Sequence, residues 1–508
     1  MLFKLSRKRL SVNAMDHLNQ TPLYLALSKG HRKLVELLLR NGADSNAIDK
    51  NGFTPLHIVA KKQYCIGFAR MIFELSQHKP VKVNVRDRKG NTPLYYALFY
   101  RRRNLVQLLL KNGANPNLPY ANGLTPLHML ISKYYGIGFA KEFFEINDVN
   151  RRKVNVDARF KKETTSLDLV WNGYPDFKDW MELLLTRGAN PNLCNKKGLT
   201  PLHIICKDVY ESHEMVELFF KINDHNHRAV KVNARDTSGN TPLHLILQSK
   251  RFKIFNTVEF LLKKGANLNV ANNEGLTPLH IICKKNVEEL YCDVNDLVEL
   301  FLRMSNERHQ TLQINACDEK GRTPLQLAVA NLKPDVVEAL LNYGADISNF
   351  VFPTESDFEI EEFEKKHYGI NFKLRLASSV LPVIELLENR GYELNRRDAL
   401  IIMKLLLKLR SFEKSADVKD CWYDDEKFVK EAKDIMINPS LSLNDLTRLR
   451  SEEAEKLFTH RDYFKLVHSE NWWKLPKGPR ESCTAYLCEI MSRGFIQRWT
   501  WDPFLFLE

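Results

Sequence analysis

The sequence predicts an all-α fold: a solenoid of helix-turn-helix repeats followed by a small helical C-terminal domain. The first observation behind this prediction is that one short helix-start pattern recurs from residue 21 to residue 323. The second is the length of 508 residues, which exceeds what a single hydrophobic core usually accommodates. The third is the composition, because 44% hydrophobic and 27% charged residues are typical of a folded chain. Together they favour one array of repeats over separate domains.

The recurring pattern is clearest at residues 273–280, which read Asn-Glu-Gly-Leu-Thr-Pro-Leu-His. Thr277 has the side chain of a helix cap, and Pro278 suits the first helical position because its ring fixes φ and no N–H is needed there. Gly275 suits the turn before them, since glycine adopts positive φ without strain. The pattern therefore predicts a turn, a cap and a helix, in that order.

The cap threonine stands at positions 21, 54, 92, 125, 165, 200, 241, 277 and 323, so the spacing runs from 33 (54 − 21) to 46 (323 − 277) residues. Each cap is followed by an apolar helix and then by a second one, which in the shorter units ends at a glycine. With Thr-Pro-Leu-His at residues 54–57, 125–128, 200–203 and 241–244, the chain resembles the ankyrin-repeat family over residues 11–349. The resemblance implies a solenoid of stacked helix pairs with hairpin tips that binds other proteins.

Long intervals alternate with short ones, so we predict that the true unit is a pair of repeats. Each long member carries an insertion, found at residues 78–84, 150–155, 227–233 and 309–315. These insertions are either tolerated surface loops or a ridge along one edge of the array. The fifth repeat departs most from the pattern, because Glu163, Ser166 and Asp168 replace the glycine, proline and histidine. This repeat has either diverged in sequence while keeping its place in the stack, or it forms a hinge.

The resemblance also implies a binding face formed by hairpin tips and inner-helix residues. Counting seven and eight positions on from each cap threonine places lysines and one aromatic pair on that face: Lys61, Lys62, Phe99, Tyr100, Lys133, Lys207, Lys284 and Lys285. The net charge of +13 and these lysines favour an acidic protein segment with an apolar anchor as the partner. Nucleic acid is not expected, because base stacking would need more than one aromatic pair along the groove.

The sequence predicts no catalytic site. The recurrent histidines stand a whole repeat or more apart, at 57, 128, 203, 244 and 280, and in the ankyrin family this position hydrogen-bonds between neighbouring repeats. The nine cysteines are scattered without the spacing of a zinc site, and the sequence has no phosphate-binding loop or nucleophile motif. We therefore expect no enzyme activity, no cofactor and no metal.

After residue 349 the pattern changes. Residues 350–396 read as an acidic linker and a degenerate capping repeat, with a helix pair over 374–391, and residues 397–508 read as helical. With Trp-Trp-Lys-Leu-Pro at residues 472–476 and an apolar segment over 487–495, the end of the chain resembles the PRANC domain that follows ankyrin repeats in proteins of poxviruses and parasitoid wasps. That resemblance implies an F-box-like segment that docks on the Skp-type adaptor of a cullin-RING ubiquitin ligase through Leu475, Pro476, Leu487, Ile490, Met491 and Phe495. Residues 477–479 depart from the acidic step usual after Leu-Pro, and the alternative is that the C-terminal apolar residues only form a core.

The sequence therefore predicts a substrate receptor that links a captured protein to a ubiquitin ligase. The alternative is a masking inhibitor or scaffold without a ligase link. No apolar stretch of 18 residues occurs, so we expect no membrane-spanning segment. Scattered cysteines favour free thiols in a reducing compartment, and we expect a cytoplasmic protein, with Arg-Lys-Arg at residues 7–9 as an alternative nuclear address.

Overall fold

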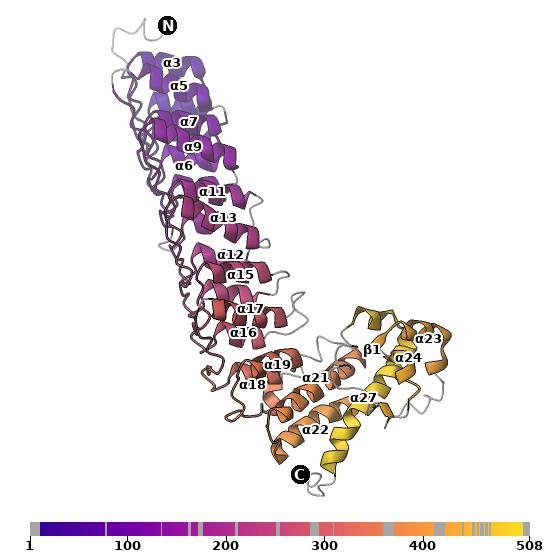
Figure 1. Cartoon of the computed structure of the whole chain (residues 1–508). Coiled ribbons are helices and arrows are strands. Elements are labelled where there is room, and N and C mark those ends of the chain that lie inside the picture. The colour runs from indigo at the N-terminus through magenta and orange to yellow at the C-terminus, as the bar shows by residue number, and fades with distance from the viewer. Residues whose placement is uncertain are drawn as a thin grey trace. The chain divides into compact units, whose positions relative to one another are not determined.

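The structure, a computed structural model, describes residues 11–500 except 64, 77–78, 134, 161–163, 171–175, 209–211, 250–253, 285–293, 308, 359–369, 411–421, 439–440, 450–452, 455–456, 458–461, 463–465 and 467–468. The chain forms two compact units, Met1–Thr237 and Ser238–Glu508. Figure 1 labels many of the elements of both units.

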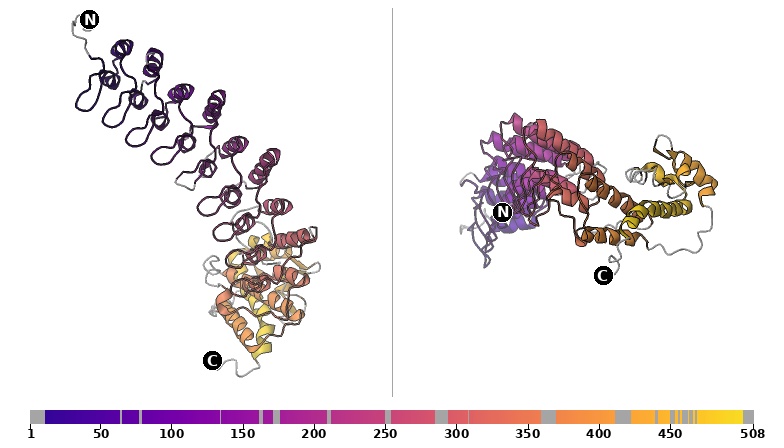
Figure 2. Two further views of the ribbon diagram at one scale, coloured as in Figure 1. Left: turned by 90° about the vertical axis from the view of Figure 1, so that its left-hand side faces the viewer. Right: turned by 60° about the horizontal axis from the view of Figure 1, so that its bottom comes forward.

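The first unit consists of stacked pairs of helices, so the predicted all-α repeat fold is confirmed. In each pair an inner helix follows the cap residue and an outer helix follows a short turn. The inner helices are α2 (Pro22–Lys29), α4 (Pro55–Lys61), α6 (Pro93–Phe99), α8 (Pro126–Ser132), α10 (Ser166–Val170) and α12 (Pro201–Asp208). The outer helices are α3 (Arg32–Arg40), α5 (Cys65–Leu75), α7 (Arg103–Lys111), α9 (Ile137–Val149), α11 (Phe177–Thr186) and α13 (Ser212–His225). Neighbouring outer helices pack on one another, as do the inner helices from α2 to α10, and the hairpin loops lie along one side (Figure 2, left).

The cap pattern joins neighbouring repeats as well as starting helices. His57 Nδ1 accepts a hydrogen bond from the backbone N–H of Thr54 (3.0 Å) and lies 2.8 Å from the Thr54 hydroxyl. Its Nε2 lies 3.1 Å from the carbonyl oxygen of Asn91 in the next repeat, so Nε2 carries the proton and donates it. Burial lowers the pKa of His57 from 6.5 to about 4, so the ring is neutral at pH 7. Two more bridges of 3.1 Å confirm the predicted structural role: His244 to Leu276 and His280 to Arg322.

In the fifth repeat an aspartate takes the place of the histidine. Asp168 Oδ2 accepts hydrogen bonds from the backbone N–H (2.8 Å) and the hydroxyl (3.0 Å) of Thr165. The N–H of Asp168 donates back to the Thr165 hydroxyl at 3.2 Å, which completes a reciprocal cap. Burial raises the pKa of Asp168. Because the helix start is preserved, these contacts favour drift within the stack over a hinge at this repeat.

One asparagine in each short repeat binds the backbone of the long repeat that follows it. Asn117 Nδ2 donates to the carbonyl oxygen of Lys153 (2.7 Å), and Asn117 Oδ1 accepts from the N–H of Asn155 (2.7 Å). The equivalent asparagines make the same two bonds to the following long repeat: Asn46 to residues 80 and 82, Asn192 to 229 and 231, and Asn269 to 311 and 313. Each insertion loop is therefore fixed to the repeat before it.

Two of the insertions also supply an arginine to the preceding repeat. Arg152 Nη1 donates to the carbonyl oxygens of Leu110 (2.9 Å) and Ala114 (3.1 Å), at the C-terminal end of α7. Arg228 makes the equivalent bonds at the end of α11, to Leu185 (3.1 Å) and Ala189 (2.9 Å). The last carbonyl groups of a helix have no partner within the helix, so a cationic donor there stabilises it. The loops are thus structural connections between the two members of a pair.

Replacing Arg228 by methionine is expected to lower the free energy of unfolding by about 1–2 kcal/mol. The carbonyl of Leu185 at the end of α11 and that of Ala189 just after the helix would both lose a charged donor. Urea unfolding followed by circular dichroism measures this change. The matched control is Lys231→Met, which removes one positive charge from an exposed side chain in the same loop. Equal unfolding midpoints for the two variants would contradict the assignment.

The second unit begins with further helix pairs. Its inner helices are α14 (Pro242–Gln248), α16 (Pro278–Lys284) and α18 (Pro324–Ala330), and its outer helices are α15 (Phe255–Lys263), α17 (Val294–Glu307) and α19 (Pro334–Asn342). They are followed by η2 (Glu355–Phe358), α21 (Ile370–Asn389), α22 (Arg396–Arg410), η3 (Trp422–Asp424), α23 (Glu426–Lys433), β1 (Met436–Asn438), β2 (Leu441–Ser442), α24 (Leu443–Leu446), η4 (Glu470–Lys474) and α27 (Lys477–Thr500). The strands β1 and β2 pair antiparallel, with Met436 opposite Ser442.

The predicted helix pair over residues 374–391 is wrong, because one helix, α21, runs through this segment. It is continuous through Pro382, and no glycine interrupts it before Gly391, which has a φ of 89°. The partner of α21 is α22, and α21 also packs against α19 and α27. The helix therefore covers the last repeat, as the end of a repeat array requires.

In the sequence, the boundary between the two compact units falls at residues 237 and 238, between the sixth and seventh repeats and inside the predicted array. Helix α19, before residue 349, packs on α21, after it, and α21 packs on α22, which continues past residue 396. The predicted domain boundaries at 349 and 396 therefore do not separate independent packing units, and they stay predictions. Among the described helices, none combines the length and the apolar character needed to cross a membrane.

Candidate functional site

The candidate site is built on the inner helix α6. Four aromatic side chains lie in its last two turns and at its C-cap. Tyr95 and Phe99 are one helical turn apart and stack at 5.7 Å between ring centroids. Tyr96 and Tyr100 have the same spacing and stack at 6.5 Å. Residues four apart share a helix face, so the sequence Tyr-Tyr-Ala-Leu-Phe-Tyr places the rings in two stacked pairs.

Neighbouring repeats extend this group of rings. Phe53, just before the second cap, contacts Tyr96 at 5.8 Å, and Tyr120, from the hairpin before α8, contacts Tyr95 at 4.8 Å. Phe99 is 41% exposed and Tyr100 is 39% exposed, whereas Tyr96 and Tyr120 are buried. We call these six residues the aromatic platform: Phe53, Tyr95, Tyr96, Phe99, Tyr100 and Tyr120. Its surface is formed by Phe99 and Tyr100.

Hydrogen bonding holds the base of the platform in place. The hydroxyl of Tyr96 donates to Asp87 Oδ2 at 2.6 Å. Burial, with this hydrogen bond, raises the pKa of Tyr96 above its usual value. Burial also raises the pKa of Tyr95. These phenols are therefore neutral at pH 7, and the rings form a fixed, uncharged surface.

Two of the predicted lysines lie on the platform. Lys61 Nζ is 4.5 Å from the ring centroid of Phe53 and 5.5 Å from that of Tyr96. Lys133 Nζ is 4.3 Å from the ring centroid of Phe99. An ammonium group over a ring face is attracted by the ring quadrupole, so these cation–π contacts hold both charges against rings of the platform. The site thus combines apolar surface with positive charge.

A family model described as ankyrin repeats, in three copies, matches residues 2–78, 42–120, 66–153, 170–272 and 252–350, which together cover more than half of the chain. The chain belongs to the ankyrin-repeat family. Human transient receptor potential cation channel subfamily A member 1 is 28% identical over 287 residues, which are 51% of this chain and 24% of that protein. An ankyrin repeat protein of Acanthamoeba polyphaga mimivirus is 24% identical over 264 residues, which are 50% of this chain and 31% of that protein.

Mouse Rabankyrin-5 is 38% identical over 92 residues, which are 18% of this chain and 8% of that protein. The chain thus spans less than a third of the length of these relatives. The crystal structure of the ankyrin repeat domain of Bcl-3, a member of the IkappaB protein family, matches with a TM-score of 0.34 and 21% identity, over 52% of this chain and 93% of that one. Membership of the ankyrin-repeat family makes this chain a protein-interaction module.

The ankyrin repeats bring together four of the eight predicted partner-binding residues: Lys61, Phe99, Tyr100 and Lys133. Lys62 follows Lys61 and is exposed, and Lys207 is exposed on α12. Lys284 is exposed on α16 in the second unit, and Lys285 lies outside the described residues. The sequence prediction missed Tyr95 and Tyr96, which the four-residue spacing could have revealed. It also missed Phe53 and Tyr120, which only the stacking of repeats brings to the site.

The predicted adaptor-docking residues have a different environment. Leu475 is 3% exposed, Leu487 is 0% and Ile490 is 2%, and Phe495 is also buried. They belong to α27 or to the turn before it, and α27 packs against α21 and α22. Pro476 is half-buried, and the side chain of Met491 lies outside the described residues. In this structure the four buried side chains form core and are not a surface that a partner could contact.

Trp473 is the large exposed side chain of this segment. It is 47% exposed, and the guanidinium of Arg480 lies 5.2 Å from its ring centroid. Within the described residues, no group of three or more His, Cys, Asp or Glu side chains is arranged to hold a metal ion.

Proposed function

We propose that the aromatic platform binds an acidic segment of a partner protein. The observation that carries this proposal is the pair of exposed rings, Phe99 and Tyr100, with the ammonium group of Lys133 over Phe99. The ammonium group of Lys61 lies over the neighbouring platform rings of Phe53 and Tyr96. An apolar side chain of the partner covers the exposed rings, and its carboxylates pair with the two lysines. Aromatic residues at the centre of an interface commonly contribute the largest share of binding energy.

Replacing Phe99 by alanine is expected to weaken partner binding about tenfold or more, because the exposed ring is lost while its charged neighbours remain. The experiment first inserts a photo-crosslinking amino acid at position 99 in cells and identifies the adducts. A matched insertion at Val149, which is 83% exposed on α9, gives the background. Retention of the identified partner by Phe99→Ala and by Val149→Ala is then compared. Equal retention would remove the platform as the binding site.

The charge of the platform is tested separately. Lys61→Glu together with Lys133→Glu is expected to abolish binding of an acidic partner, and the binding of the wild-type chain is expected to weaken as salt is raised. Binding that is insensitive both to salt and to this double substitution would mean that the partner is not acidic.

We propose further that the C-terminal helices link the captured protein to a cullin-RING ubiquitin ligase through a Skp-type adaptor. Exposure of Trp473, two residues before Leu475, supports this proposal, because nearly half of this large side chain is exposed next to the segment that resembles an F-box. A pull-down with the adaptor compares the intact chain with Trp473→Ala. Recovery by the intact chain alone supports the link. If the intact chain does not recover the adaptor, the masking or scaffold function takes its place.

A further inference from the structure

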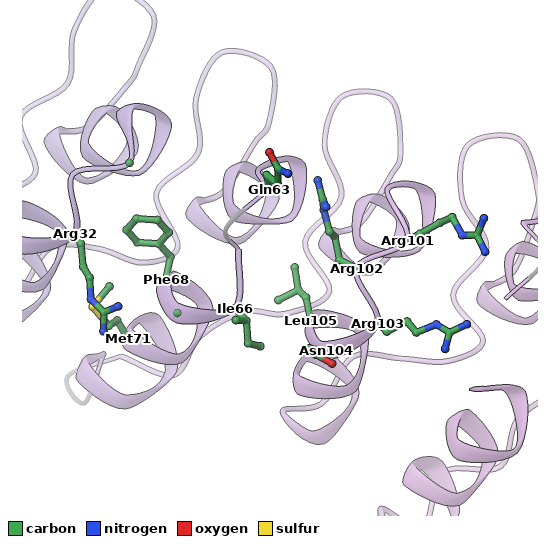
Figure 3. A pocket seen from close by; sticks show the side chains of 12 residues that line it. Arg32, Gln63, Ile66, Phe68, Met71, Arg101, Arg102, Arg103, Asn104 and Leu105 are labelled. Carbon is green, nitrogen blue, oxygen red and sulfur yellow. The ribbon is translucent and has the colours of Figure 1, made fainter. Parts of the chain in front are cut away.

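A hollow of 790 Å³ lies at the turns between inner and outer helices of the first three repeats (Figure 3). Its apolar lining comes from Ile66, Phe68 and Met71 of α5 and from Leu105 of α7. Arginine side chains from the starts of α3 and α7 complete it, and the described lining contains no acidic residue. The hollow is therefore apolar with a positively charged border.

Two of the lining arginines, Arg101 and Arg103, contact a residue of the fourth repeat. Arg103 Nη2 donates to the carbonyl oxygen of Tyr135 at 2.7 Å, and the guanidinium groups of Arg101 and Arg103 lie 5.8 Å and 6.0 Å from the Tyr135 ring centroid. In Figure 3 these two side chains extend toward the next repeat, away from Ile66 and Phe68. They add positive charge to the region but are not placed to contact a ligand in the hollow.

The guanidinium groups of Arg32 and Arg102 are the two in the lining that a ligand could contact. No hydrogen bond or ion pair links either guanidinium to a described residue, and Arg102 Nε is buried without a bond to any of them. A buried donor without an acceptor is unfavourable, so a ligand acceptor that bonds to Arg102 Nε removes this cost when it binds.

The ninth repeat shows what a purely structural cation does at this position. Lys333 precedes α19 as Arg102 precedes α7, and the residue before each has positive φ, 52° at Leu332 and 56° at Arg101. Lys333 Nζ donates to the carbonyl oxygens of Ile282 (3.0 Å) and Cys283 (2.9 Å) at the end of the preceding inner helix. Arg102 makes no such bond to the described residues, so capping the neighbouring helix does not account for it.

We propose that this hollow is a second docking site, which binds an acidic peptide segment of a partner protein. Carboxylates of the segment pair with Arg32 and Arg102, and an apolar side chain of the segment rests on Ile66 and Phe68. Charge complementarity supports this occupant, because guanidinium groups form strong hydrogen bonds with carboxylates and the described lining contains no carboxylate of its own. The site lies at the turns and not on the aromatic platform, so it does not depend on the function proposed for the platform.

The test is fluorescence anisotropy with a labelled synthetic peptide of alternating glutamate and phenylalanine. Arg32→Glu and Arg102→Glu are each expected to weaken its binding tenfold or more. An acidic residue is favourable near the start of a helix, so both variants should fold, which a thermal melt checks. The matched control is Lys111→Glu, which makes the same charge change at the exposed far end of α7 and is expected to leave the affinity within about twofold.

Three outcomes would overturn the proposal. Equal weakening by Lys111→Glu would show a general effect of charge. Equal affinity for a peptide with glutamine in place of glutamate would show that the arginines do not recognise carboxylates. Loss of binding in Phe99→Ala with no loss in Arg102→Glu would place the peptide on the aromatic platform. A tenfold loss confined to the two arginine variants supports the hollow.

Discussion

Replacing His57 by leucine is expected to lower the free energy of unfolding by roughly 3 kcal/mol, whereas His57→Gln is expected to cost less than about 1 kcal/mol. Leucine leaves the buried N–H of Thr54 and the carbonyl of Asn91 without their partner. Glutamine replaces both bonds, as the ninth repeat already shows. There the N–H of Thr323 donates to Gln326 Oε1 (2.7 Å), and Gln326 Nε2 donates to the carbonyl of Val351 (3.0 Å).

Urea unfolding of the intact chain at pH 7 measures both variants. The expected order of the unfolding midpoints is wild type, then His57→Gln slightly below it, then His57→Leu far below. If leucine were tolerated as well as glutamine, the bridge between the second and third repeats would contribute packing only, and the two hydrogen bonds of His57 would have no net effect on stability.

The same histidines are expected to make the fold sensitive to acid. Burial lowers the pKa of His57 and of His128 from 6.5 to about 4 in the folded state. Between pH 6.5 and pH 4 the unfolded chain therefore binds more protons than the folded chain, and stability falls as the pH falls. The loss approaches roughly 3 kcal/mol for each of these two histidines below pH 4. His57→Gln should accordingly lose less stability than the wild type between pH 7 and pH 4.5.

The sequence predicts the repeats well because their signals are local. Thr54 and His57 are three residues apart, so the cap, the helix start and the first half of the bridge are all contained in one short segment. The alternating intervals also predict that repeats occur in pairs. The contacts between the two members of a pair cannot be predicted in this way, because Asn117 and Arg152 bond to backbone groups more than 30 residues away in the chain.

Only those residues of the candidate site that lie on a single helix could be predicted from the sequence. Phe99 and Tyr100 follow from counting along α6, but Phe53 and Tyr120 reach the platform from the hairpins of other repeats. The hollow beside Arg102 has the same origin, since its lining comes from the turns of three repeats. In the C-terminal region the sequence shows that Leu487, Ile490 and Phe495 are apolar. It could not show that the helix carrying them, α27, packs against α21.

Replacing Leu487 by aspartate is expected to destabilise the C-terminal helices by about 4 kcal/mol or more. Leu487 is 0% exposed on α27, which packs along α21, so the variant would bury a carboxylate without a partner. A hydrogen bond also holds α27 in this core: the hydroxyl of Tyr486 donates to the carbonyl oxygen of Leu449 at 2.8 Å. The control is Lys477→Asp, at the exposed first residue of α27, where an acidic side chain is favourable.

Amide hydrogen exchange distinguishes the core role of α27 from the docking role implied by the PRANC resemblance. If Leu487 is core, Leu487→Asp removes protection from α21 and α22 together with α27, because these helices pack on one another. If Leu487 belongs to an adaptor-docking face, the variant loses adaptor binding while the protection of α21 is unchanged. The second result would mean that α27 leaves α21 when it binds, and that the buried positions of Leu475 and Ile490 belong to the unbound state alone.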